Sequence, residues 1–210
     1  MEVSRLLHEI PKPTIAMLNG PAAGAGLSLA LACDLRIAAQ SARLHTAFAN
    51  VGFSGDFGGS YFLSRLVGTG KARELYYTAE PLDAADALSL GIVNRVVPDA
   101  DLAETTILLA SKLARGPRIA LAAMKRNFNA AESGSLAQLL DLEARHQIET
   151  GRTQDHHKNA STVWREAQQL LANGSIVVEA ADPIEVIENV MRYFYAMGLQ
   201  GVKPLKQLKH

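Results

Sequence analysis

The chain has 210 residues, of which 48% are hydrophobic and 20% are charged, so it can bury a sizeable core. Twenty-one basic residues balance twenty-one acidic ones, which leaves no net positive field to attract nucleic acid or an anionic membrane. The single cysteine, Cys33, excludes an internal disulfide and suits a small buried side chain in a reducing compartment. Residues 1–11 carry charges and no long apolar run, so neither a signal peptide nor a membrane span is predicted. We expect a soluble, cytoplasmic protein.

The first half of the chain alternates between helix and strand signals. Residues 1–9 have the spacing of a short amphipathic helix, which ends before Pro11. The apolar run over 14–18 predicts a buried strand, and the turn Asn19-Gly20-Pro21 follows it. The pattern then predicts a helix from Gly26, strands over 34–38, 42–48 and 92–97, and helices over 60–67, 71–78 and 83–90. Such alternation is typical of an α/β fold.

The second half has a different character, because the strand signal disappears after Pro98. Helical periodicity over 101–114, 118–131 and 135–150 predicts a helical layer. Further on, residues 175–178 favour a strand, and Asp182 is a good N-cap for an amphipathic helix that reaches residue 195. We therefore divide the chain into a core over 1–98, a helical region over 99–172 and a tail over 173–210.

A turn of small residues connects the first predicted strand to the next helix. It reads Asn19-Gly20-Pro21-Ala22-Ala23-Gly24-Ala25-Gly26. Such a turn lets a ligand approach the backbone, and the free N–H groups at the start of the helix can hold an anion or a developing oxyanion. The alternative is that the small residues only let the helix and strand pack closely. A phosphate-binding loop is excluded, because neither Gly-Lys-Ser/Thr nor Gly-x-Gly-x-x-Gly is present.

One carboxylate, Asp56, lies among apolar and glycine residues in the predicted loop over 51–59. Burial disfavours the charged form of such a group, which would suit it to general acid or base catalysis. The alternative is an N-cap for the following helix. Asp34 is interpreted as a structural residue at the start of a strand. The histidines lack the spacing of metal ligands and Cys33 has no nearby histidine, so neither a metal site nor a thiol nucleophile is predicted.

Several motifs occur in a fixed order along the chain. They are Pro11-Lys12-Pro13-Thr14-Ile15-Ala16, Asn19-Gly20, Gly24-Ala25-Gly26, Leu29-Ala30-Leu31-Ala32-Cys33-Asp34, Gly58-Gly59 and Gly91-Ile92-Val93. As a set they resemble the crotonase (enoyl-CoA hydratase/isomerase) superfamily, over roughly residues 5–172. The resemblance implies a spiral of β-β-α turns with a C-terminal helical layer, assembled as a homotrimer or homohexamer. It also implies an acyl-CoA thioester as ligand, with coenzyme A as part of the substrate and no separate cofactor.

The resemblance also implies an oxyanion site. In that family two backbone N–H groups polarise the thioester carbonyl, and the second donor corresponds to Ala25, with Gly24 and Gly26 beside the substrate. The segment that carries the first donor would lie before Met1, so we expect a chain without the usual N-terminal part of the fold. Loss of one such donor typically lowers the rate roughly a hundred- to a thousand-fold, and the chain alone is then poorly active.

The reaction type depends on the side chains at three positions. Hydratases of the family use two glutamates to activate water, and Ser28 and Phe48 stand at those positions here. Asp56 falls where epoxyphenylacetyl-CoA isomerases, dienoyl-CoA isomerases and aryl-CoA dehalogenases have a carboxylate, and the first of these types is the most similar. We expect an isomerase in which Asp56 moves a proton, with Phe48 and Phe53 against the acyl group. The alternatives are an enoyl-CoA hydratase of fatty-acid or aromatic-acid degradation, a dehalogenase, and a remnant that binds without turnover.

Overall fold

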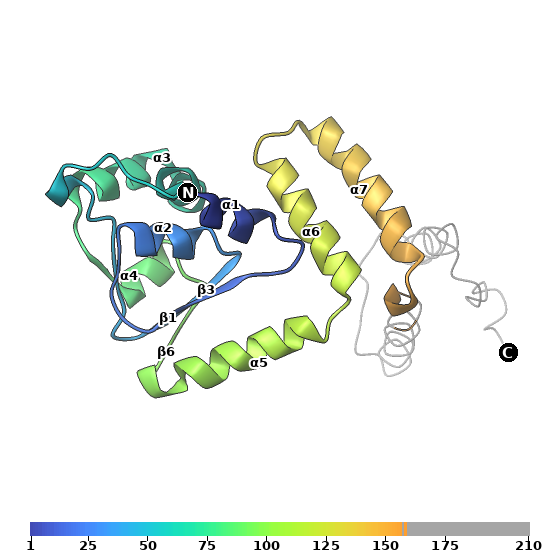
Figure 1. Ribbon diagram of the computed structural model, residues 1–210, viewed down its shortest axis with the longest axis horizontal. Helices are drawn as coiled ribbons and strands as arrows, with labels where there is room; N and C mark the ends of the chain where they lie inside the picture. Colours follow the sequence, from blue (N-terminus) through green and yellow to red (C-terminus); the bar gives the residue numbers. More distant parts are fainter. Residues whose placement is uncertain (157, 159–210) are drawn as a thin grey trace, which may run out of the picture. The chain divides into compact units, whose positions relative to one another are not determined.

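The computed structural model describes residues 1–156 and 158 of the chain (Figure 1). The contacts divide the chain into two compact units, Met1–Ser133 and Gly134–His210, which are treated separately below. The predicted tail over 173–210 lies outside the described residues, and the boundaries expected at 98 and 172 stay predictions. Within the described part, no helix has both the length and the apolar character needed to cross a membrane.

The first unit combines short strands with helices, in agreement with the predicted α/β class. Its strands are β1 (Ile15–Leu18), β2 (Ala22–Ala23), β3 (Leu35–Ala39), β4 (Arg43–His45), β5 (Leu82–Asp83) and β6 (Arg95–Val97). Its helices are α1 (Glu2–Glu9), α2 (Ala25–Leu31), α3 (Gly59–Thr78), α4 (Ala84–Ser89), α5 (Leu102–Ala114) and α6 (Arg118–Ala131). The two-residue strands β2 and β5 were not predicted, because so short a segment has no periodicity of its own.

Two small sheets organise this unit. One has the order β1-β3-β6 and is parallel throughout. The other has the order β2-β4-β5, in which β2 and β4 run parallel and β4 and β5 antiparallel. The glycine-rich turn therefore follows β1 of the first sheet and contains β2 of the second sheet. This places the start of α2 where the two sheets meet.

The central strand β3 is buried on both faces, as is usual for a parallel strand between helices. Ala38 faces one core together with residues of α2 and α4, whereas Ile37 and Ala39 face a second core that includes Leu102 of α5. Figure 1 shows α2 and α4 on one side of the sheet and α5 on the other. The alternation along β3 follows from the period of two in a strand. The helix α5 is thus part of the core packing and not a separate layer.

The segment α3 agrees with the prediction, which placed two helices over 60–67 and 71–78. The two halves follow each other directly within Gly59–Thr78, and the backbone between them is non-helical at Gly68, where φ is 77° and ψ is 159°. Only glycine adopts this conformation at little cost, so the break occurs at the residue that permits it. The two predicted halves are therefore present, joined by a sharp bend.

The predicted amphipathic helix α1 forms, but its apolar side chains remain largely exposed. Val3 and Leu6 are each 53% exposed, and the buried residue of the helix is Ser4. The helix is held by polar contacts from α6 instead. Lys125 Nζ donates to the Leu7 carbonyl oxygen at 2.8 Å, and Asn129 Nδ2 donates to the His8 carbonyl oxygen at 2.8 Å.

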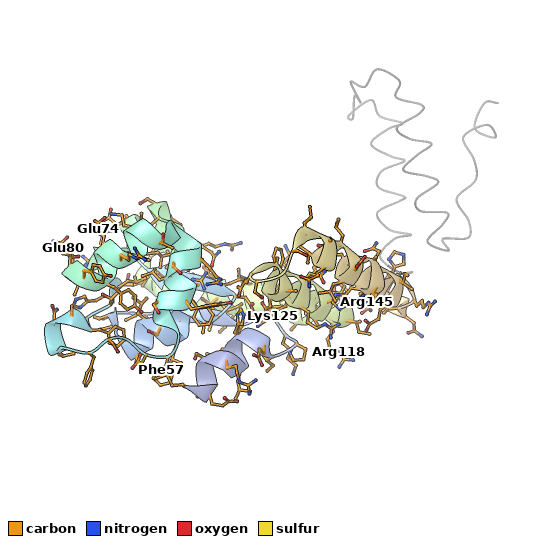
Figure 2. All side chains as sticks on the ribbon, turned by 90° about the horizontal axis from the view of Figure 1, so that it is seen from above. Phe57, Glu74, Glu80, Arg118, Lys125 and Arg145 are labelled. Carbon is orange, nitrogen blue, oxygen red and sulfur yellow. The ribbon has the colours of Figure 1, made fainter. Side chains whose placement is uncertain are left out.

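A buried ion pair fixes α6 to the start of β3. Lys125 is 6% exposed, and its Nζ lies 2.8 Å from Oδ2 of Asp34 (Figure 2). The same carboxylate oxygen accepts from the backbone N–H of Thr14 at 2.6 Å and from its hydroxyl at 2.9 Å. Asp34 thus has the structural role that the sequence indicated. Each charge in this network is matched by a partner, as buried charges require.

In the second unit, the described residues form α7 (Leu136–Gly151), which agrees with the helix predicted over 135–150. The helix begins with a capping box. The hydroxyl of Ser135 accepts from the Gln138 N–H, and the Gln138 side chain accepts from the Ser135 N–H at 2.9 Å. This reciprocal pair satisfies two backbone donors that a helix start leaves open.

Candidate active site

The glycine-rich turn ends at Gly24, whose backbone φ is 50°. Its N–H donates to the carbonyl oxygen of His45 at 2.9 Å, which fastens the turn to the end of β4. The helix α2 begins at the next residue, Ala25, which is half-buried. As in any helix, the N–H groups of the first turn have no partner within the helix, so the Ala25 N–H is available to a ligand. The predicted donor therefore stands where a ligand oxygen could meet it.

Phe48 lies directly against this turn. A Cβ atom built on Gly24 would lie 3.6 Å from the Phe48 ring, which is an ordinary van der Waals distance, so the ring packs beside the turn. Phe48 is only 6% exposed and stacks on Tyr76, with ring centroids 5.9 Å apart and an interplanar angle of 16°. The Phe48 ring thus packs between Tyr76 and the turn that precedes the proposed oxyanion donor.

Two of the residues expected at the substrate are placed differently. The side chain of Phe53 is 71% exposed, because the chain turns outward at Gly52, where φ is 71°. Only its backbone N–H contacts the site, donating to the Phe48 carbonyl oxygen at 3.0 Å. Gly26 is exposed, and a Cβ atom there would meet open space. The structure therefore brings Phe48 and Gly24 together but leaves Phe53 and Gly26 at the periphery.

Asp56 lies in a loop with unusual backbone geometry. Its neighbours Gly55 and Phe57 have φ of 108° and 45°, and Gly58 has φ of 74° (Figure 2). A left-handed phenylalanine costs roughly 1–3 kcal/mol and persists only where the surrounding structure enforces it. Such outliers gather at functional sites, so the strain beside Asp56 supports a functional interpretation of this loop.

The Asp56 carboxylate is oriented inward. Its Oδ1 is shielded from solvent and has no hydrogen-bond partner within the described residues. The residue is not the N-cap of α3, which is Gly58 without a side-chain cap, although the Asp56 carbonyl accepts from the Gly59 N–H at 3.0 Å. The capping alternative is therefore not what the structure shows. A buried carboxylate oxygen without a partner is costly unless a ligand provides one.

Tyr76 of α3 is a site residue that the sequence did not reveal. A Cβ atom on Gly55 would lie 3.2 Å from the Tyr76 ring, and one on Gly59 would clash with both the Tyr76 and Ser28 hydroxyls. Burial raises the pKa of the Tyr76 hydroxyl, the neighbouring Ser28 hydroxyl lowers it, and the charge of Asp56 raises it further. Gly55 and Gly59, on either side of Asp56 in the sequence, could have indicated that a large side chain packs here, since both leave room for Tyr76.

Substitution of Gly59 by alanine is expected to destabilise the fold by about 1–3 kcal/mol, because the new methyl group displaces Tyr76 and Ser28. The measurement is urea unfolding followed by circular dichroism. Gly70→Ala provides a matched control in the same helix, since a Cβ atom there meets nothing within 4 Å and alanine favours the helix. A Gly59→Ala variant as stable as Gly70→Ala would contradict the described packing.

Ser28 and Phe48 stand at the two positions where the resemblance implies glutamates in hydratases, and neither carries a carboxylate. Ser28 is 1% exposed, and its hydroxyl donates to the Gly24 carbonyl oxygen at 3.2 Å. Phe48 has no ionisable group. Asp56 is therefore the carboxylate that this cluster of residues contributes. Next to it, Tyr76 also lines a hollow of about 360 Å³ together with Ser54 and Ser60, which lie on either side of Asp56 in the chain.

Other candidate groups have ordinary structural roles. Nε2 of His45 lies 2.5 Å from the carbonyl oxygen of Ala79. Cys33 is half-buried and not fully buried as expected, and burial raises the pKa of its thiol, which disfavours the reactive thiolate. Over the described part of the chain, no three His, Cys, Asp or Glu side chains gather as metal ligands.

Comparison with known proteins places these residues in a family. The model of the enoyl-CoA hydratase/isomerase family matches residues 1–170. The chain belongs to this family. A Rhodobacter capsulatus member named "Probable enoyl-CoA hydratase" is 43% identical over 149 residues, which are 71% of this chain and 58% of that protein. The 1,2-epoxyphenylacetyl-CoA isomerase of Escherichia coli is 40% identical over 157 residues, which are 75% of this chain and 60% of the isomerase.

A solved structure of a Thermobifida fusca YX member in complex with CoA has a TM-score of 0.66 at 36% identity, covering 68% of this chain and 56% of that one. The resemblance to the crotonase superfamily and the predicted fold class are thus confirmed. The chain spans less than two thirds of the length of each of these three family members. Both hydratase and isomerase names occur among them, so the names leave the reaction type open.

Proposed function

We propose that this family member binds an acyl-CoA thioester and moves a carbon–carbon double bond by proton transfer. Asp56 removes a proton from a carbon near the thioester, and the electron pair moves to the thioester oxygen as an enolate. The N–H of Ala25 donates a hydrogen bond to that oxygen. Protonated Asp56 then returns the proton to a different carbon, which restores the carboxylate. Coenzyme A enters as part of the substrate, and no other cofactor takes part.

The observation that most supports this proposal is the buried, unpartnered Oδ1 of Asp56. It lies in a strained loop that connects, through Tyr76 and Phe48, to the turn that ends at Gly24. Shielding from water helps a general base to accept a proton from carbon. Oδ1 of Asp56 is shielded and has no hydrogen-bond partner within the described residues.

A hydratase is the second candidate, because a relative of this chain carries that name. Water addition needs a positioned general base and acid at the double bond, and two side chains usually share this task. With Ser28 and Phe48 at those positions, Asp56 would have to do both. We therefore expect hydration to be slow compared with double-bond migration.

We further propose that the protein assembles as a trimer or a pair of trimers. Support comes from large apolar side chains that the described chain leaves exposed on α5 and α6, among them Ile107 at 63% and Phe128 at 76%. Such surfaces are typical of association sites in soluble proteins. Light scattering of the purified protein should give three or six times the chain mass, and a monomer would contradict this proposal.

The test of the proposed reaction is a titration of the purified chain with crotonyl-CoA and with a 3-enoyl-CoA, followed by an ultraviolet assay of both mixtures. We expect both esters to bind, the 3-enoyl ester to become conjugated, and crotonyl-CoA to stay unhydrated. Hydration faster than migration would identify a hydratase instead. Binding without turnover would identify a chain that only holds the ester, and absence of binding would contradict the proposal altogether.

A further inference from the structure

A second hollow, of about 480 Å³, lies in the first unit and shares no lining residue with the candidate active site. It is formed by the loop before β1, by Ile15 of β1, and by the helices α5 and α6. All of these elements belong to Met1–Ser133. Sites for small molecules typically have volumes of roughly 300–1,000 Å³. The hollow is therefore large enough to hold a small molecule.

Most of the hollow's lining is aliphatic. Ile15, Leu113 and Leu121 are half-buried around it. Of the described residues that line it, Thr106 is the one uncharged polar side chain, and its hydroxyl already donates to a backbone carbonyl oxygen of α5 at 2.8 Å. These lining residues include no aromatic ring and no amide or carboxylate side chain. The lining therefore offers no stacking surface for a base and no counter-charge for a cation, and it favours a ligand with an aliphatic body.

Two cations complete the lining, Lys12 and Arg118. Both side chains are exposed, and neither forms an ion pair or a side-chain hydrogen bond within the described residues. Lys12 lies between two prolines, which restrict its backbone, and its carbonyl oxygen accepts from Lys125 Nζ at 3.2 Å. Arg118 is the first residue of α6 and follows Pro117. The backbone thus holds two positive charges beside an aliphatic surface.

We propose that this hollow binds a fatty-acid carboxylate, whose chain lies along Ile15, Leu113 and Leu121 and whose head group pairs with Lys12 and Arg118. The guanidinium group can donate two parallel hydrogen bonds to a carboxylate, and the ammonium group adds a second positive charge. Each methylene group that the aliphatic lining removes from water adds to the affinity. The site does not depend on the reaction proposed above, because the two share no residue.

Titration calorimetry of the full chain with decanoate tests the site directly. We expect saturable binding of one decanoate per chain and at least about ten-fold weaker binding of decanol, because a neutral head group cannot pair with the cations. Decyltrimethylammonium has the same chain with the opposite charge and should not bind. Added salt should weaken decanoate binding, since it screens exposed charges. Equal binding of decanoate and decanol, or no saturable binding of decanoate, would overturn the proposal.

Two further variants examine the head-group contact and the aliphatic lining separately. Arg118→Gln is expected to raise the Kd for decanoate about three- to ten-fold, whereas Lys112→Gln, at an exposed position of α5 outside the lining, should leave it unchanged. Ala110→Phe should fill the hollow and abolish binding, and Ala103→Phe, at an exposed position of the same helix outside the lining, should not. Circular dichroism checks that the variants fold.

If Arg118→Gln bound decanoate as tightly as Lys112→Gln, the head group would lie elsewhere and the proposal would be wrong. The same conclusion would follow if a folded Ala110→Phe variant kept the affinity of Ala103→Phe.

Discussion

Replacement of Asp56 by asparagine is expected to abolish double-bond migration, with a loss of about a hundred- to ten-thousand-fold in kcat. Asparagine has the same size but cannot accept a proton from carbon. Binding of the acyl-CoA ester should stay within about two-fold, because in the proposed mechanism the backbone N–H of Ala25 holds the thioester and the carboxylate does not. Stopped assays of the conjugated product and titration calorimetry measure the two effects separately.

The variant should also fold normally, since Oδ1 of Asp56 makes no hydrogen bond that the substitution would break. Asp141→Asn is the matched control, because Asp141 is an exposed residue of α7. Its activity should equal that of the wild type. If Asp56→Asn retained the same activity as this control, the aspartate would have no part in the reaction.

Replacement of Lys125 by methionine is expected to destabilise the protein by about 3–5 kcal/mol. Methionine keeps much of the apolar stem but removes the ammonium group, which leaves the partly buried carboxylate of Asp34 without its counter-charge. The carbonyl oxygens of Leu7 and Lys12 also lose a donor, at 2.8 and 3.2 Å. Urea unfolding at neutral pH measures the loss.

A surface pair provides the control for this experiment. Lys71 and Glu74 lie 2.8 Å apart in α3, but their side chains are 37% and 57% exposed. Solvent screens such a pair, so Lys71→Met should cost less than about 1 kcal/mol. Combining Lys125→Met with Asp34→Asn should cost less than the sum of the single changes, because the two residues share one interaction. Additive losses would show that the ion pair is not formed in solution.

Much of this fold could be predicted from the sequence where the pattern is local. The helix α4 is an example: Asp83 caps it by accepting from the Asp86 N–H at 2.8 Å, and Gly91 follows it with φ of 74°. The parallel strand β1 was visible as an apolar run. By contrast, the exposed apolar side of α1 could not be foreseen, because it depends on donors from α6, more than a hundred residues away.

In the candidate site, too, residues in local motifs could be proposed from the sequence, whereas contacts between distant residues could not. Ala25 and Asp56 were proposed from their motifs, which are short segments of sequence, and their roles stay predictions. Tyr76 was missed because its role arises only when α3 brings it against Gly55 and Gly59, and nothing in its local pattern distinguishes it from the exposed Tyr77. Phe53 was expected against the acyl group, and the exposure of its side chain could not be foreseen, since proximity in sequence to Asp56 does not fix the direction of a side chain.

The link between α1 and α6 has a consequence for how the chain is made. The Leu7 carbonyl oxygen receives its hydrogen bond from Lys125, which is 118 residues later. At a synthesis rate of about 5–20 residues per second, Lys125 is made roughly 6–24 seconds after Leu7. For that time Val3 and Leu6 belong to a short helix that is marginal in water on its own. The residues of α1 are therefore among the last of the first unit to reach their final contacts, and a chaperone that binds apolar segments could bind them before then.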